Sequence, residues 1–240
     1  MYKKAKSNIN LMAMEEDGRL QVLAGIELLE QSRLIKWSSE ELIFTAVNRD
    51  NFECSWKKVF DPTFGRFICW ILFSSGAELF AKGICLINQV EIRHTRKVRS
   101  YPSSESNIDL WISAQAKAIK SKSQAPGYKF PVANYRTLDY LIRGARSPKN
   151  KTSPDIEAPF FKLFRKMNAS ESEENLILSS YDLLRETIRN RDAHAYVPNV
   201  RDAHVNLVSE LFTDCFNIFT KWIPGGAHAL NKWRENSATY

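Results

Sequence analysis

The stretch Arg185-Glu-Thr-Ile-Arg189-Asn190-Arg191-Asp192-Ala193-His194-Ala195-Tyr196 gathers three arginines, an amide, an imidazole and a phenol within about three helical turns. Upstream of it, apolar and small residues recur at intervals of three and four, which predicts a helix with one buried face: Leu176, Ile177, Ser180, Leu183, Leu184 and Ile188. Pro198 cannot continue that helix. The polar stretch therefore lies at the end of a helix that is anchored in a core and open to a partner.

The spacing within this stretch decides which groups can act together. Asn190 and His194 are four residues apart, so they share one face if the helix continues through His194. Arg189 and His194 are five apart, roughly 140° around an ideal helix, and would meet only if the backbone bends near Ala193. A histidine transfers protons near neutral pH, and an arginine holds a phosphate oxygen without losing its charge. The pair suits phosphate chemistry.

The run Arg189-Asn190-Arg191-Asp192-Ala193-His194 resembles the signature of the HEPN family of all-α nucleases and nucleotide-associated domains. That signature is an Arg, four to six residues and a His, commonly with Asn, Asp or His after the Arg. Ala195-Tyr196 extends the likeness to the His-x-Tyr form of HEPN toxins that are paired with nucleotidyltransferase antitoxins. Gly76-Ala-Glu78-Leu-Phe-Ala-Lys82-Gly is similar to the earlier HEPN helix, which often reads Gly-x-Glu-Leu with a Lys soon after. The resemblance covers roughly residues 62–90 and 172–222.

The resemblance implies metal-independent endoribonuclease activity. His194 would take the proton from a ribose 2′-OH, which attacks the adjacent phosphate and leaves a 2′,3′-cyclic phosphate. Arg189 would stabilise the charge on the pentacoordinate phosphorus, and Asn190 would orient the histidine or the phosphate. Arg191 and Tyr196 would support the site. No cofactor or metal ion is implied.

The resemblance also implies partners and a role. HEPN nucleases generally dimerise with two motifs facing across the interface, so we expect a two-fold homodimer in which a second His194 acts as the acid. The expected role is RNA cleavage by a toxin or an antiviral-defence effector, with an antitoxin or defence-system protein as a possible partner. Tyr196 is then the position where a nucleotidyltransferase antitoxin would attach a nucleotide.

Two other functions fit the same residues. A HEPN-like bundle can hold RNA or a nucleotide, or dock a partner enzyme, without cutting. In a helical interaction protein, Arg189 and His194 would only cap a helix C-terminus and satisfy its carbonyl groups.

Glu78 has two interpretations as well. It is an ordinary surface carboxylate paired with Lys82 four residues on, which contributes a few tenths of a kcal/mol. Alternatively it reaches the motif helix and orients Arg189 or His194, as the resemblance favours.

The net charge of +7 is concentrated in the middle of the chain. Residues 91–151 hold 13 Lys and Arg against 4 Asp and Glu, whereas the rest of the chain has a net charge of −2. Four of these cations follow each other closely and are candidates for RNA binding: Arg93, Arg96, Lys97 and Arg99. Aromatic residues are interleaved with the charges, as in surfaces that hold single-stranded nucleic acid. The same composition also fits a solvated basic loop region whose aromatics anchor it to the core.

Composition places the chain among globular proteins of the cytoplasm. Hydrophobic residues make up 44% of its 240 residues, and nine glycines and nine prolines argue against disorder. The four cysteines form no Cys-x-x-Cys pair, and Cys69 and Cys85 lie in an apolar run, which predicts buried free thiols in a reducing compartment. The N-terminus lacks the apolar segment of a signal peptide, and the apolar run 67–73 is too short to span a membrane. Zinc is not expected, because the four histidines are widely spread: His94, His194, His204 and His228.

The periodicity predicts an all-α, HEPN-like up-and-down helical bundle. We expect a single domain over residues 1–240, with residues 91–160 as a basic, aromatic-containing insertion between a central helix and the motif helix. Asp61-Pro62 opens the central helix of about 25 residues. Other expected features are, in order, a loose arm at 1–10, a helix over 10–36, a helix start at 38–41, short helices at 108–119, 138–142 and 160–164, a polar loop at 167–174, a last helix over 200–223 and a C-terminal tail.

Overall fold

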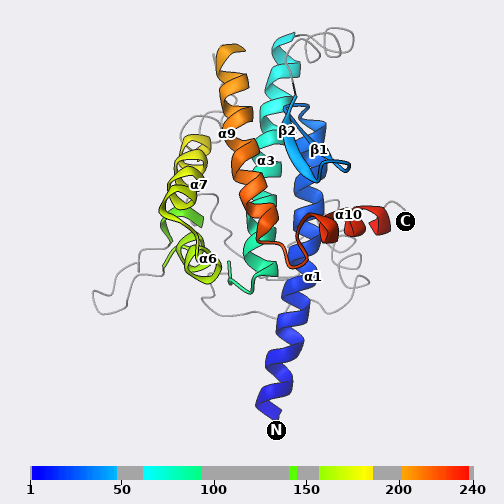
Figure 1. The fold of residues 1–240 in the computed structure, drawn as a ribbon, viewed down its shortest axis with the longest axis vertical. Helices are drawn as coiled ribbons and strands as arrows, with labels where there is room; N and C mark the ends of the chain where they lie inside the picture. The colour runs from blue at the N-terminus through cyan, green and yellow to red at the C-terminus, as the bar shows by residue number, and fades with distance from the viewer. Residues whose placement is uncertain (1, 48–61, 93–140, 145–156, 186–201, 238–240) are drawn as a thin grey trace, which may run out of the picture. The chain divides into compact units, whose positions relative to one another are not determined.

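The computed structural model describes residues 2–47, 62–92, 141–144, 157–185 and 202–237. The chain divides into two compact units, residues 1–92 with 136–240 and residues 93–135, and every described residue belongs to the first unit. The described part is mainly helical (Figure 1). Its elements are α1 (Tyr2–Gln31), β1 (Ile35–Ser38), β2 (Ile43–Ala46), α3 (Pro62–Ile87), α6 (Pro159–Met167), α7 (Glu171–Leu183), α9 (Asp202–Lys221) and α10 (Gly226–Ser237).

Helices α1 and α3 run antiparallel and touch along their backbones. A Cβ atom added to Gly25 of α1 would lie 2.6 Å from the backbone nitrogen of Phe80 and 2.9 Å from the carbonyl oxygen of Gly76. Seven residues earlier on α1, Gly18 lies against Gly83 of α3 in the same way, with 2.7 Å between the Gly18 oxygen and a Cβ added to Gly83. We call this contact the glycine seam. It places the two helices closer than any side chain would allow.

The other side of α3 packs against α9 through aromatic rings. Phe73 meets Phe212 at 5.1 Å between ring centroids, and Phe80 meets Phe216 at 5.3 Å. Phe219 continues the same stack toward α6 and α7, where it lies near Phe160 and Tyr181. We call this contact the aromatic seam. The predicted helix at Asp61-Pro62 is confirmed as the central helix α3, because it is buried against α1 on one side and α9 on the other.

The short hairpin β1–β2 covers α9. The strands are antiparallel, with Ile35 opposite Ala46 and Ser38 opposite Ile43. The Asn217 side chain of α9 accepts a hydrogen bond from the Phe44 amide (2.8 Å) and donates one to its carbonyl group (3.1 Å). The Asn217 side chain thus satisfies both backbone groups of Phe44, as a neighbouring strand would do.

The hairpin corrects two predictions, the helix over 10–36 and the helix start at 38–41. Helix α1 ends at Gln31, where the Ser32 hydroxyl bonds the Leu29 carbonyl and accepts from the Leu34 amide, and Arg33 takes a φ of 60°. After that break the chain buries alternate residues as a strand does. Residues 39–42 form the hairpin turn.

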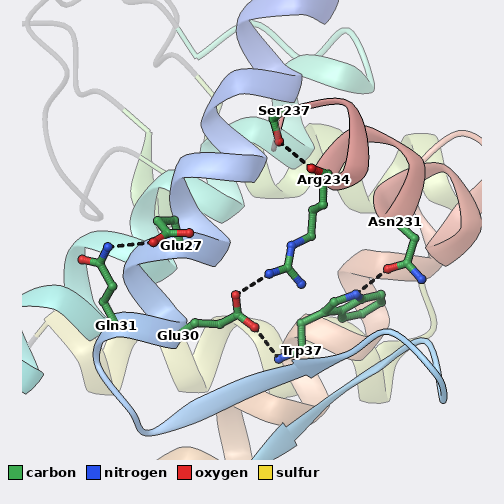
Figure 2. Close-up of polar contacts among 7 residues, drawn as sticks. All are labelled: Glu27, Glu30, Gln31, Trp37, Asn231, Arg234 and Ser237. Atoms are coloured by element: carbon green, nitrogen blue, oxygen red, sulfur yellow. Dashed lines mark hydrogen bonds and ion pairs between the residues drawn. The ribbon is translucent and has the colours of Figure 1, made fainter. Parts of the chain in front are cut away.

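The predicted C-terminal tail is wrong, since residues 226–237 form α10. Pro224-Gly225-Gly226 makes only a turn, with φ of 83° and 62° at the two glycines. Figure 2 shows how α10 is fixed: Trp37 Nε1–H donates to Asn231 Oδ1 (2.6 Å), and Arg234 pairs with Glu30 of α1. These partners lie about 200 residues apart in sequence, which is why local pattern could not indicate the helix.

Two further boundaries differ from the prediction. The expected loose arm at residues 1–10 is helical from Tyr2, because no proline or glycine interrupts the sequence between it and Gly18. The expected polar loop at 167–174 is shorter, because α7 begins at Glu171. Ser170 and Glu173 form a capping box there, with the Glu173 amide bonding Ser170 Oγ (3.3 Å) and the Ser170 amide bonding Glu173 Oε2 (2.9 Å).

Helix α3 includes the segment Ile68–Ile87, which is long and apolar enough to cross a membrane by length and composition. This segment is 72% buried inside the bundle. A core helix of a globular protein passes the same test, so the segment is weak evidence for a span.

Candidate functional site

Most of the predicted site residues lie outside the described part of the chain. The motif residues Arg189, Asn190, Arg191, His194 and Tyr196 fall in 186–201, and Arg93, Arg96, Lys97 and Arg99 fall in 93–140. Glu78 is described, and so is α7, the helix that leads into the motif. The described part of the candidate site therefore consists of α3 and the last turn of α7.

Glu78 lies on α3 and is only 5% exposed. Its Oε1 pairs with Nζ of Lys82 one turn later, as in the first of the two interpretations, and the Lys82 side chain is 13% exposed. That interpretation placed the pair at the surface, whereas both side chains are nearly buried. The other interpretation, in which Glu78 orients Arg189 or His194, stays a prediction because both of those residues lie outside the described part of the chain. Removing one partner of a buried ion pair strongly destabilises the folded protein, because the remaining charge is left unpaired in a low-dielectric environment.

Helix α7 packs against α3 beside Glu78. The Tyr181 hydroxyl of α7 donates to the carbonyl oxygen of Ala77, the residue before Glu78, at 2.9 Å. Burial raises the pKa of Tyr181 well above its ordinary value of 10.0, and the nearby Cys215, Cys85 and Glu78 raise it further. The phenol therefore stays protonated and serves as a fixed donor. It holds the helix that leads to the motif next to the buried carboxylate of Glu78.

Helix α7 is joined to α9 by a buried thiol. Cys215 Sγ donates to Ser180 Oγ at 3.1 Å, and burial raises the pKa of Cys215 to about 12. Burial also raises the pKa of Cys69 to about 11 and that of Cys85 above the ordinary thiol range. The predicted buried free thiols are confirmed at these three positions; Cys54 lies outside the described residues. Thiols with such pKa values are poor nucleophiles at neutral pH.

The last turn of α7 carries a group of charges at the entrance to the motif. Leu184 and Arg185 continue the helix in the wider π-helical geometry, a feature often found at functional sites. Asp182 Oδ1 accepts from Arg185 at Nε (3.0 Å) and Nη2 (2.8 Å). Arg143, from the short helical piece 141–143 beside α7, reaches the same oxygen at 3.4 Å.

Sequence reasoning missed Tyr181, Asp182 and Arg143. A signal was present for Asp182 and Arg185, which are three residues apart on one helix face. Tyr181 lies four residues after Ile177 and three before Leu184, so the apolar periodicity of α7 could have predicted its burial. Nothing local linked Arg143 to Asp182, which is 39 residues away.

Among the described residues, no three His, Cys, Asp or Glu side chains gather in a way that would hold a metal ion. No family model, curated protein or solved structure matches this chain.

Proposed function

We propose that this protein is a metal-independent endoribonuclease with a HEPN-like helical arrangement. The observation that carries the proposal is the Arg189-x4-His194-x-Tyr196 motif directly after α7, a helix whose inner face packs beside the buried Glu78. In the described part of the chain, α1, α3, α7 and α9 alternate in direction, which supports an up-and-down bundle (Figure 1).

The proposed reaction is an internal transesterification. His194 accepts the proton of a ribose 2′-OH, and that oxygen forms a bond to the adjacent phosphorus as the bond to the 5′-oxygen breaks. The leaving 5′-oxygen takes a proton from a second acid, which in a two-fold dimer is His194 of the partner subunit. Arg189 holds the phosphate oxygens as their charge grows, and Asn190 orients the reacting groups.

The proposed role of Glu78 is to orient the reacting side chains without contacting the RNA. A buried carboxylate beside the motif helix can accept hydrogen bonds from Arg189 or His194 and fix their orientation. Arg191 and Tyr196 complete the polar surface, and Tyr196 is the proposed acceptor of a nucleotide from an antitoxin. The proposed setting is a cytoplasmic toxin–antitoxin or antiviral-defence system, and the basic residues 93–99 are the proposed first contact with RNA.

The test is cleavage of mixed cellular RNA in EDTA by purified protein, with the product ends analysed for 2′,3′-cyclic phosphate. The sequence offers a matched control, because Arg201-Asp202-Ala203-His204 repeats the letters of residues 191–194. We expect His194→Ala to lower the cleavage rate at least 100-fold and His204→Ala to leave it within about twofold.

Two results would count against the proposal. Equal cleavage by wild type and His194→Ala would remove His194 from the chemistry. Binding of RNA by all three proteins with no cleavage by any would identify a HEPN-like binding module instead.

A further inference from the structure

The outer edge of β1 is closed by side chains of α1 and α10. Trp37 lies opposite Phe44 in the hairpin, and Phe44 turns its amide and carbonyl groups away from β1. Because opposed residues of an antiparallel pair turn outward together, the backbone groups of Trp37 face the other edge. There Glu30 Oε1 accepts from the Trp37 amide at 3.3 Å, and Asn231 Nδ2 donates to the Ser39 carbonyl at 3.1 Å. Since Asn231 belongs to α10, that helix covers part of this edge.

Polar contacts hold α10 against this edge. Figure 2 shows the Trp37 indole, which donates to Asn231 Oδ1 at 2.6 Å, and the Arg234 guanidinium, which pairs with Glu30 Oε2. The side chains of Arg234 and Glu30 are 31% and 25% exposed, so water and salt reach their ion pair. One carboxylate of α1 thus binds both the strand edge and the helix that covers it.

The share of α10 in the apolar core is small. Leu230 is the one buried residue of α10, whereas α9 buries large rings such as Phe216 and Phe219 completely. Trp233 is partly buried, and its ring lies 5.2 Å from the guanidinium carbon of the exposed Arg19. A segment that buries few apolar groups can open locally at a lower free energy than the core needs to unfold.

Two glycines join α10 to the end of α9. Gly225 and Gly226 have φ of 83° and 62°, and a Cβ added to Gly226 would meet no atom within 4 Å. Glycine adopts positive and negative φ with similar ease, so the backbone can change direction here with little steric cost. A pair of such residues at the end of a helix is suited to act as a hinge.

We propose that α10 is a strap that opens as one unit about Gly225-Gly226, while α1, α3 and α9 stay packed, and that it controls access to the outer edge of β1. Opening removes Asn231 from the Ser39 carbonyl and from the Trp37 indole. An uncovered strand edge offers its backbone groups to an extended peptide. The strap is independent of the proposed nuclease activity.

Hydrogen exchange of the full chain tests the strap, because it reports the opening of each element separately. The reporters are the Trp37 indole proton, which bonds Asn231 only while α10 is in place, and the backbone amides of α10 and α9. In the wild type we expect protection factors of the indole proton and of the α10 amides at least about 100-fold below those of α9.

Two variants of α1 form a matched pair. Glu30→Gln removes the charge that pairs with Arg234 and keeps an oxygen acceptor for the Trp37 amide. Glu27→Gln removes the same charge three residues earlier, where the exposed Glu27 bonds Gln31 of the same helix at 2.7 Å (Figure 2). We expect Glu30→Gln to lower the protection of α10 and of the indole proton about fivefold and to leave α9 unchanged. Glu27→Gln should change neither by more than about twofold.

A double variant tests the ion pair itself. Arg234→Gln added to Glu30→Gln should lower the protection of α10 by less than about a further twofold, because the pair is already lost. A further loss as large as the first would show that the two residues act separately, and the carboxylate would not be the latch of the strap.

Three other results would overturn the strap. Equal protection of α10 and α9 in the wild type would make α10 part of the same cooperative unit. Loss of protection confined to the last residues of α10, with the Trp37 indole proton protected like α9, would show fraying of the helix end. Equal effects of Glu27→Gln and Glu30→Gln would show a general effect of charge on α1.

Discussion

The glycine seam and the aromatic seam lie on different sides of α3 and fill the space between helices in different ways. At the glycine seam, Gly25 meets the backbone of α3 directly, and the interhelical distance is set by main-chain atoms. At the aromatic seam, rings such as Phe80, Phe216 and Phe219 occupy the gap, and the distance is set by the size of the side chains. A contact between backbones cannot accommodate an added atom without moving the helices apart. A contact between rings is instead most sensitive to truncation, because removing ring atoms removes many dispersion contacts.

The difference has a consequence for the candidate site. Helix α7, which leads into the motif, belongs to the aromatic seam through Tyr181 and its contacts with Phe160, Phe212 and Phe219. The glycine seam joins α3 to α1. Loosening the aromatic seam should therefore disturb α7, which precedes the motif in the sequence, while a change at the glycine seam should first affect α1.

The largest effect is expected from Phe219→Ala. Phe219 is fully buried and contacts rings from α3, α6 and α7, so truncation removes dispersion contacts and leaves a cavity. We expect a loss of about 4 kcal/mol in the free energy of unfolding, measured by urea denaturation. Phe219→Leu should lose less than half as much, and a loss below about 1 kcal/mol in Phe219→Ala would show that the rings do not define this seam.

A somewhat smaller effect is expected from Gly25→Ala. Alanine normally stabilises a helix by up to about 1 kcal/mol relative to glycine, but here its Cβ would lie 2.6 Å from a backbone nitrogen of α3. We expect a net loss of about 2–3 kcal/mol because the two backbones must separate. The control is Ala24→Ser at the neighbouring exposed position, which should stay within about 0.5 kcal/mol. A stabilising Gly25→Ala would contradict the close backbone contact.

The smallest effect is expected at Ser170, the exposed N-cap residue of α7, which is not one of the residues that form either seam. Ser170→Ala should lower the free energy of unfolding by about 1 kcal/mol, because the N-cap hydrogen bond is lost.

The hydrogen bond from the Ser170 amide, followed by that from its hydroxyl, lowers the pKa of Glu173 below its ordinary value of 4.5. The folded state favours the ionised Glu173 carboxylate. Its contribution to the free energy of unfolding is therefore present above pH 4.5 and is lost as the pH falls through the lower pKa of the folded state. The stability difference between wild type and Glu173→Gln should therefore shrink between pH 6 and pH 3, and a constant difference would contradict the capping box.

The sequence by itself determined the main helices. The apolar periodicity and the Pro62 start predicted α3, and the repeat of apolar residues over 200–223 predicted α9, because each pattern is local and long. It also located the buried thiols, and it offered the Glu78–Lys82 pair, which depends on a spacing of four residues, as one of two interpretations of Glu78. The motif at 189–196 and the basic segment at 93–99 remain predictions from sequence, since they lie outside the described residues.

The tertiary structure decided what depends on residues far apart in the chain. Helix α10 forms where Asn231 and Arg234 meet Trp37 and Glu30, and the backbone of Phe44 in β2 bonds the Asn217 side chain of α9. The hydrogen bond from Tyr181 to the Ala77 carbonyl brings α7 to α3 beside Glu78, and the sharing of Asp182 by Arg143 and Arg185 requires two segments to lie side by side. Periodicity reports which face of a helix is apolar, but it does not report which partner covers that face, and these features depend on the partner.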